Sequence, residues 1–121
     1  MDYFLDSYAM IEIARGNEKY KEYLNHKCFT SVLNLYEFYF SLLRNFEEGV
    51  AREFFYIFKK RILQIRDEHI FKASNFKLKN IRRGFSYADC IGYTIALDYG
   101  MKFLTGDKEF ENLESVEFVK K

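Results

Sequence analysis

Two aspartates follow short apolar runs at opposite ends of the chain. Asp6 comes after the apolar triplet of YFLDSYA, and Asp107 follows the apolar pair, threonine and glycine of FLTGDKEF. Each run predicts a short β-strand, so each acid is expected at a strand end. Taken singly, either aspartate is explained as a cap, because its side chain accepts hydrogen bonds from free backbone N–H groups at the start of a helix or turn.

Two further acids lie in predicted helices. In SVLNLYEFYFSLL the polar residues Asn34, Glu37 and Ser41 recur at spacings of three and four, which places them on one stripe of an otherwise apolar helix. That stripe faces either solvent or a cleft. Asp89 follows Ser86 by three residues, which is the spacing of a capping box, and there it would also suit the positive end of the helix dipole.

Short apolar segments alternate with helical patterns along the chain. The predicted strands are residues 3–6, 27–31, 61–65, 102–106 and 116–120. The predicted helices are residues 7–16, 17–25, 31–45, 47–60, 67–83 and 86–100, with a helical turn at 107–113. This alternation favours an α/β domain with a mainly parallel sheet. In such sheets the loops after the strands gather at one edge, where ligands bind, so Asp6 and Asp107 would both lie there.

Together, Asp6, Glu37, Asp89 and Asp107 would form a cluster of like charges at that edge. Carboxylates packed together in partly buried space repel one another and have raised pKa values unless a cation neutralises them. Oxygen ligands without clustered Cys or His point to a hard ion, Mg²⁺ or Mn²⁺, rather than zinc. Such an ion activates water and stabilises a leaving oxygen, so the cluster suits phosphodiester cleavage.

Composition excludes several classes of protein. The 121 residues, 49% of them hydrophobic, suffice for the core of one domain, residues 1–121. The formal charge of +1 gives no overall field for nucleic acid or membrane. No apolar run reaches the roughly 18 residues of a membrane span, and Cys28 and Cys90 form neither a disulfide framework nor a zinc site. We therefore expect a soluble, cytoplasmic protein with two free thiols.

The ordered motifs FLDSYA, TSVLNLYEF, SYADCIGYTIA and FLTGDKEF resemble those of the PIN domain family, and in particular those of the VapC-like ribonuclease toxins. The resemblance covers essentially the whole chain, although residues 47–83 carry no family motif. It implies a three-layer α/β/α fold with a mainly parallel sheet of four to five strands. It also implies a metal-dependent endoribonuclease that leaves 5′-phosphate and 3′-hydroxyl ends on RNA.

The resemblance further implies roles for individual residues. It places Mg²⁺ or Mn²⁺ on the catalytic acids Asp6, Glu37, Asp89 and Asp107. Thr105 matches a hydroxyl position beside the metal, and Ser7 and Asn34 match supporting polar positions. As partners it implies a cognate antitoxin protein and a homodimer.

Two other surfaces are suggested by the residues between and around these motifs. The stretch between Ile70 and Ala88 has no acid but holds the basic residues Lys72, Lys77, Lys79, Arg82 and Arg83. They form either a patch for RNA phosphates or a solvated helix face. Aromatic side chains are dense at Tyr36, Phe38, Tyr39, Phe40, Phe54, Phe55, Tyr56 and Phe58. They fill the core or, in part, an exposed surface for a homodimer or an antitoxin.

Other functions are compatible with acids at strand ends. Receiver domains and aspartate-nucleophile phosphatases share this placement, but Tyr8 stands where the phosphatases have a second aspartate. A PIN-like scaffold that binds RNA or a protein without cutting is the remaining alternative, because retained acids do not prove turnover.

Overall fold

A four-stranded, fully parallel sheet lies at the centre of the computed structural model, which describes residues 1–121. The strands are β1 Asp2–Leu5, β2 Lys27–Phe29, β3 Lys102–Thr105 and β4 Val116–Phe118, in the order β2–β1–β3–β4. On the central strand β1, Phe4 is paired with Phe29 of β2 and with Phe103 of β3. The predicted mainly parallel sheet of four to five strands is confirmed, with four strands.

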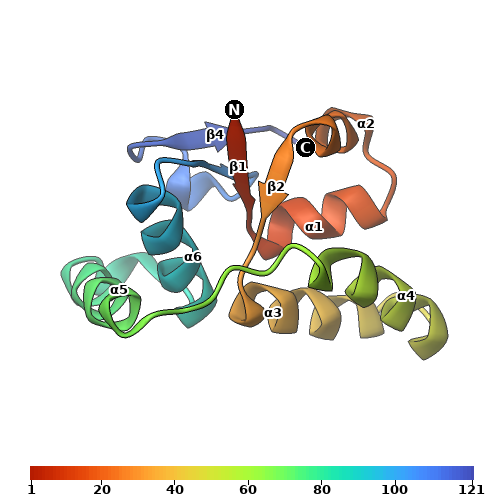
Figure 1. Cartoon of the computed structure of the whole chain (residues 1–121), viewed down its shortest axis with the longest axis horizontal. Helices are drawn as coiled ribbons and strands as arrows, with labels where there is room; N and C mark the ends of the chain where they lie inside the picture. The colour runs from red at the N-terminus through yellow and green to blue at the C-terminus, as the bar shows by residue number, and fades with distance from the viewer.

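Helices cover both faces of the sheet (Figure 1). They are α1 Ser7–Ala14, α2 Glu18–Lys21, α3 Val32–Leu43, α4 Glu48–Lys59, α5 Asp67–Lys79 and α6 Tyr87–Asp98, with 3₁₀ turns η1 Glu22–Asn25, η2 Ile81–Arg83 and η3 Lys108–Phe110. None combines the length and the apolar character that a membrane crossing requires.

Side chains that alternate along the strands supply two separate cores. Leu5 and Leu104 belong to the core formed with α1, α3 and α4. Phe4 and Phe103 point the other way, into the core formed with α5 and α6. Because both faces of the central strands are buried, these strands read as continuous apolar runs rather than alternating ones. The three-layer α/β/α arrangement is therefore confirmed.

One predicted strand is wrong. Residues 61–65 contribute only an isolated parallel bridge between Thr30 and Ile62. Two hydrogen bonds form it, from the Thr30 N–H to the Arg61 carbonyl at 3.0 Å and from the Leu63 N–H to the Thr30 carbonyl at 2.8 Å. Longer pairing is prevented because β2 ends at Phe29, and Ser31 already caps α3.

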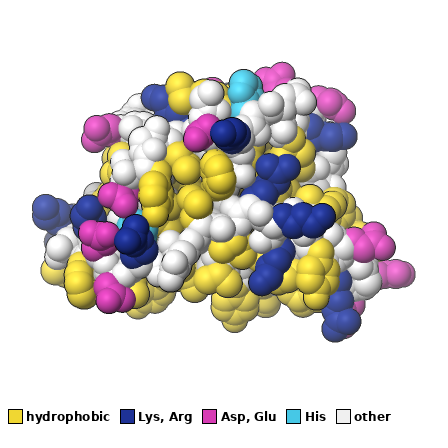
Figure 2. Space-filling model, viewed as in Figure 1, with side chains coloured by type: hydrophobic (Ala, Val, Ile, Leu, Met, Phe, Trp, Pro, Cys, Tyr) yellow, Lys and Arg dark blue, Asp and Glu magenta, His cyan; other side chains and the backbone are white.

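Of the eight dense aromatic side chains, two are fully buried, three are half-buried against the core and three are exposed. Phe38 and Phe58 are fully buried and pack edge to face with ring centroids 5.2 Å apart. Tyr36, Phe40 and Tyr56 are instead 70%, 60% and 62% exposed. Figure 2 shows hydrophobic side chains gathered along the lower edge of the molecule, under α3 and α4.

Gly92 of α6 is the point where three elements that carry acids meet. A Cβ at this position would lie 2.7 Å from Cε1 of Phe4 in β1 and 2.9 Å from Oδ1 of Asn34 in α3. Only glycine therefore lets α6 approach both β1 and α3. Asp6, Glu37 and Asp89 lie on or directly after these three elements, so this close packing sets their spacing.

We expect Gly92→Ala to destabilise the fold by about 1–3 kcal/mol, the usual cost of overpacking a filled core. The matched control is Gly49→Ala, because Gly49 also lies in a helix and a Cβ at this position would meet no atom within 4 Å. That control should be neutral or slightly stabilising, since alanine is the better helix former. Urea unfolding of both variants measures the difference, and equal stabilities would contradict the close packing at Gly92.

Candidate active site

Asp6 is the most buried of the four acids. It follows β1 and caps α1, where its Oδ1 accepts a hydrogen bond of 2.8 Å from the Ala9 N–H, and its exposed fraction is 2%. Burial raises the pKa of Asp6 to about 8, and the charges of Asp89 and Asp107 add to the rise, while the Thr105 hydroxyl and the Ala9 N–H oppose it. No basic side chain forms an ion pair with Asp6 to offset this cost.

Asp89 lies in the first turn of α6 and forms the predicted capping box with Ser86. The Ser86 N–H donates to Oδ2 of Asp89 at 2.9 Å, and the Asp89 N–H donates to the Ser86 hydroxyl at 3.0 Å. Burial raises the pKa of Asp89 to about 6, with further contributions from Glu37 and Asp107. Of the two capping bonds, only the one from the Ser86 N–H involves the carboxylate, and it engages Oδ2.

Glu37 is half-buried and is held against the start of α1. The Ser7 hydroxyl donates a hydrogen bond of 3.0 Å to its Oε1. One turn earlier on the same stripe, Asn34 is fully buried and its Oδ1 accepts a bond of 2.6 Å from the Ser31 hydroxyl. The polar stripe of α3 therefore faces α1 and the sheet end rather than bulk solvent.

Asp107 follows β3 across a tight turn. The Asp107 N–H donates to the Thr105 hydroxyl at 3.0 Å, and Oδ1 of Asp107 accepts from the Glu109 N–H at 2.9 Å. Between them, Gly106 lies directly against the side chains of Tyr8 and Tyr20, where a Cβ has no room. The TGD sequence is thus required for the turn to pass α1 and bring Asp107 toward Asp6.

The four acids are coupled electrostatically, and they have no basic partner. The charges of Asp89 and Asp107 act on Asp6, and those of Glu37 and Asp107 act on Asp89. Every ion pair in the structure involves other acids.

The oxygen-only donor set and the raised pKa values fit a hard divalent cation. No group of three acidic, histidine or cysteine side chains is close enough to enclose an ion in this arrangement. The side chains thus provide suitable donor atoms but not a completed coordination cage. Rotation of the less buried Glu37, Asp89 or Asp107 side chains would be needed to complete it.

The basic stretch before Asp89 is partly neutralised. Lys72 pairs with Asp98 at 3.6 Å, and Arg83 pairs with Glu109 at 3.4 Å. Lys77 donates to the Phe85 carbonyl at 2.5 Å. Of the predicted patch, only Lys79 and Arg82 are exposed and without a bonded partner.

A polar cavity of about 490 Å³ that the sequence did not suggest lies between α1 and the end of α3. Its basic residues are Arg15, Arg44 and Lys121, with Glu12 as its single acid. Tyr8 lines it, and the pKa of Tyr8 is raised by burial and then by Glu12, Asp6 and Asp107, which places this ring between the cavity and the acids. The i, i+4, i+7 spacing of Tyr8, Glu12 and Arg15 was the available signal.

The raised pKa of Asp6 makes the metal-free protein less stable as the pH rises. The unfolded chain loses this proton near the ordinary pKa of 3.8, whereas the folded protein keeps it up to a pKa of about 8. Stability therefore falls across this interval, because the folded state binds more protons than the unfolded state.

Asp6→Asn keeps the oxygen that caps α1 and removes the titration. In chelator, we expect this variant to exceed wild type in unfolding free energy by at least about 1 kcal/mol at pH 8, the value of one pKa unit. At pH 4 the two proteins should be nearly equal. Urea unfolding at both pH values provides the measurement, and a variant less stable than wild type at pH 8 would contradict the burial of a proton-binding carboxyl.

Several solved structures share this fold, and three of them are a toxin and two toxin–antitoxin or VapBC complexes. The chain matches the Mycobacterium tuberculosis toxin VapC20, described as cleaving the sarcin–ricin loop, with a TM-score of 0.80 and 16% identity over 98% of both chains. A toxin–antitoxin complex from Klebsiella pneumoniae matches with a TM-score of 0.77 and 15% identity, over 98% of this chain and 99% of that chain. VapBC2 of Rickettsia felis, bound to promoter DNA, matches with a TM-score of 0.76 and 15% identity, over 100% of this chain and 99% of that chain.

The TM-scores show a shared fold, and at 15–16% identity the likeness extends no further than the fold. No curated protein is similar enough in sequence to count as a relative. The sequence model of the PIN domain family, however, matches residues 3–116, a span that contains both strand-end aspartates, the Glu37 helix and the Asp89 helix. That match bears out the resemblance seen in the four motifs, and the chain therefore belongs to the PIN domain family.

Proposed function

We propose that residues 1–121 form one nuclease domain that acts as a metal-dependent endoribonuclease, the toxin of a toxin–antitoxin pair in the cytoplasm. The observation that carries the proposal is the set of four acids that influence one another's charge and have no basic partner. PIN domains are a nuclease family, and the fold is that of VapC toxins. A cluster of unpaired carboxylates is costly for stability, so its retention favours a functional role.

Asp6, Glu37, Asp89 and Asp107 would hold Mg²⁺ or Mn²⁺. When bound, such an ion lowers the pKa of water and stabilises negative charge on a phosphate oxygen. The protein's own contribution is positioning: Ser7 orients Glu37 and Ser86 orients Asp89 through the bonds given above. Each bond engages one oxygen of its carboxylate and so keeps Glu37 and Asp89 at this edge of the sheet, while the other oxygen would be available to the ion.

RNA as substrate is supported by the surroundings of the acids. The acids repel a polyanion, so cations must hold the strand on either side of them. The side chain of Arg44 lines the polar cavity and makes no hydrogen bond or ion pair within the protein, and the side chains of Arg15 and Lys121 share only Glu12. Ser41 of this cavity is one helical turn, about 6 Å along the axis, from Glu37. Cavity and acids can therefore contact one strand together.

The main test is cleavage of labelled RNAs, tRNA among them, with Mg²⁺ or Mn²⁺ and with chelator. We expect wild type to cut only with metal and Asp89→Asn and Asp6→Asn to lose at least about 100-fold in rate, more than is usual for a residue that only supports a ligand. Glu53→Gln, which changes an exposed acid without an ion pair on α4, should cut like wild type. Expression in cells should slow growth for wild type and not for Asp89→Asn.

Equal RNA binding by wild type and the aspartate variants, with no cutting under any metal condition, would contradict the nuclease proposal. That outcome would favour the alternative function, a non-catalytic PIN-like scaffold for RNA or a protein. Melting temperature gives an independent reading of the metal site, because Mn²⁺ that binds the folded state should raise it for wild type more than for Asp89→Asn.

We also assign two protein partners, a cognate antitoxin and a second copy of the chain. The antitoxin is supported by the likeness to toxins solved in toxin–antitoxin complexes. The homodimer is supported by the apolar surface of α3 and α4, where Phe40, Leu43, Tyr56 and Ile57 are all exposed. Apolar patches of this kind on small proteins usually mark a partner surface.

Phe40→Asp is expected to convert a wild-type dimer into a monomer, because a charge at the centre of an apolar interface is strongly unfavourable. Phe71→Asp is the matched control, since Phe71 is 66% exposed on α5, outside this surface. Sedimentation at micromolar concentration distinguishes the species. A wild-type monomer, or dimers of all three proteins, would place the dimer contact elsewhere or remove it.

A further inference from the structure

A second pocket, of about 370 Å³, opens directly beside the acids on the side away from the polar cavity. Leu33, Tyr36 and Glu37 of α3 form one wall, and Lys77 of α5 and the start of α6 from Ser86 to Ala88 form the other. Glu37 is one of the four acids, and Ser86 is the residue that holds Asp89. Any group in this pocket therefore lies next to the proposed cleavage site.

Two exposed tyrosines line this pocket. Tyr36 and Tyr87 are 70% and 75% exposed. The hydroxyls of Tyr20, Tyr23 and Tyr93 donate hydrogen bonds inside the protein, whereas those of Tyr36 and Tyr87 have no partner. Both rings are thus accessible to a ligand, one from each wall.

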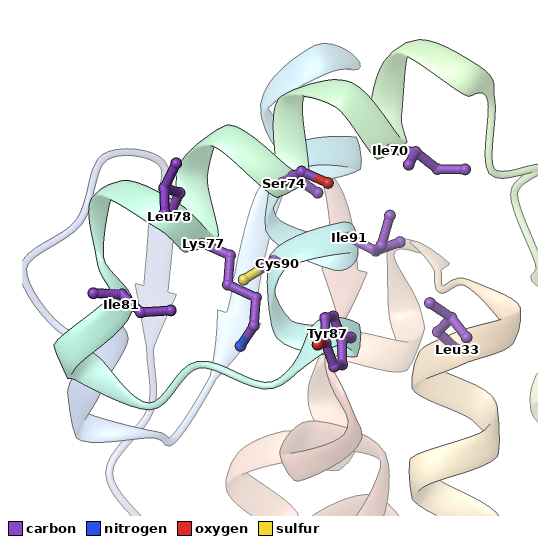
Figure 3. Close-up of a pocket in the computed structure, with 10 residues that line it drawn as sticks. Leu33, Ile70, Ser74, Lys77, Leu78, Ile81, Tyr87, Cys90 and Ile91 are labelled. Atoms are coloured by element: carbon purple, nitrogen blue, oxygen red, sulfur yellow. The ribbon is translucent and has the colours of Figure 1, made fainter.

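Lys77 fixes one of these rings and adds a positive charge. Its ammonium lies 4.7 Å from the centre of the Tyr87 ring and donates to the Phe85 carbonyl. In Figure 3 Tyr87 lies between Lys77 and Leu33 at the entrance to a further groove between α5 and α6. A ring held in place loses less freedom when a ligand stacks on it, which favours binding.

The groove in Figure 3 continues the pocket away from the acids. Leu33, Lys77 and Tyr87 line both cavities, and Ile70, Leu78 and Ile91 make the groove apolar. Moving a charged phosphate out of water into this groove would be costly, whereas the flat face of a nucleobase loses little when it leaves water. The combination of aromatic faces, aliphatic walls and one cation is the chemistry that binds unpaired nucleotides.

Building on the proposed ribonuclease function, we propose that Tyr36 and Tyr87 form a nucleobase-binding subsite that stacks an unpaired base of the RNA beside the bond to be cut. The volume is at the small end of ligand pockets, which suits a single base rather than a duplex. The subsite selects single-stranded segments and loops, because a base in a helix cannot enter it. Lys77, whose ammonium lies over the Tyr87 ring, would place a positive charge beside the stacked base.

The test uses a short single-stranded RNA that carries 2-aminopurine, with chelator present so that no cleavage occurs. Stacking on a tyrosine should quench the 2-aminopurine fluorescence of the wild-type complex. Tyr36→Ala and Tyr87→Ala should each weaken binding by about tenfold, the usual loss for one stacking aromatic, and reduce the quench. Tyr36→Phe and Tyr87→Phe keep the ring and should bind like wild type.

Two controls separate base stacking from general effects. Tyr99→Ala removes an exposed tyrosine at the opposite end of α6 and should leave binding unchanged. An RNA in which the 2-aminopurine is replaced by an abasic nucleotide should bind wild type and Tyr87→Ala equally, since only the base contacts the ring.

The inference and the ribonuclease proposal fail separately. If wild type cleaves RNA but both alanine variants bind it with wild-type affinity, the subsite is overturned and the nuclease stands. If RNA binding depends on the tyrosines but no metal supports cleavage, the subsite is supported and the protein is a non-catalytic RNA-binding scaffold. If the alanine variants change sedimentation but not RNA affinity, the tyrosines belong to a protein interface and the subsite is overturned.

Discussion

The burial of the Asp6 carboxyl group among other acids is the constraint on which the site depends. At the end of a central strand it is almost inaccessible to water, and its pKa is raised to about 8. No neighbouring basic side chain offsets the free-energy cost of this burial, so the surrounding packing must hold the carboxyl group in place. The two cores on either side of the sheet and the glycine contact at Gly92 provide that rigidity.

Three of the four acids both cap a helix or turn and belong to the acidic cluster. Asp6, Asp89 and Asp107 each accept a backbone N–H through one carboxylate oxygen, at Oδ1, Oδ2 and Oδ1 respectively. The cap restricts the rotation of the side chain and so aims the remaining oxygen in a defined direction. A helix cap thus becomes part of the preorganisation of the site, and the same residue serves folding and chemistry.

Two different surfaces flank the acids. On the side of α1, the polar cavity presents cations, of which the Arg44 guanidinium pairs with no group of the protein. On the side of α5 and α6, the tyrosine pocket presents ring faces and one lysine. A single RNA strand has both kinds of chemistry, phosphates along one edge and bases along the other. The placement of the two surfaces on opposite sides of Glu37 is consistent with a strand that crosses the acids.

The sequence by itself determined the order of the elements, the parallel sheet and the strand-end positions of Asp6 and Asp107, because periodicity and caps are local properties of the chain. It left open whether the Glu37 stripe faces solvent, and it predicted a strand at 61–65 that lacks a partner of sufficient length. Only the tertiary structure decided that Lys72 is paired with an acid and that a polar cavity and a tyrosine pocket flank the site. These features arise from contacts between residues far apart in the chain, which no local pattern encodes.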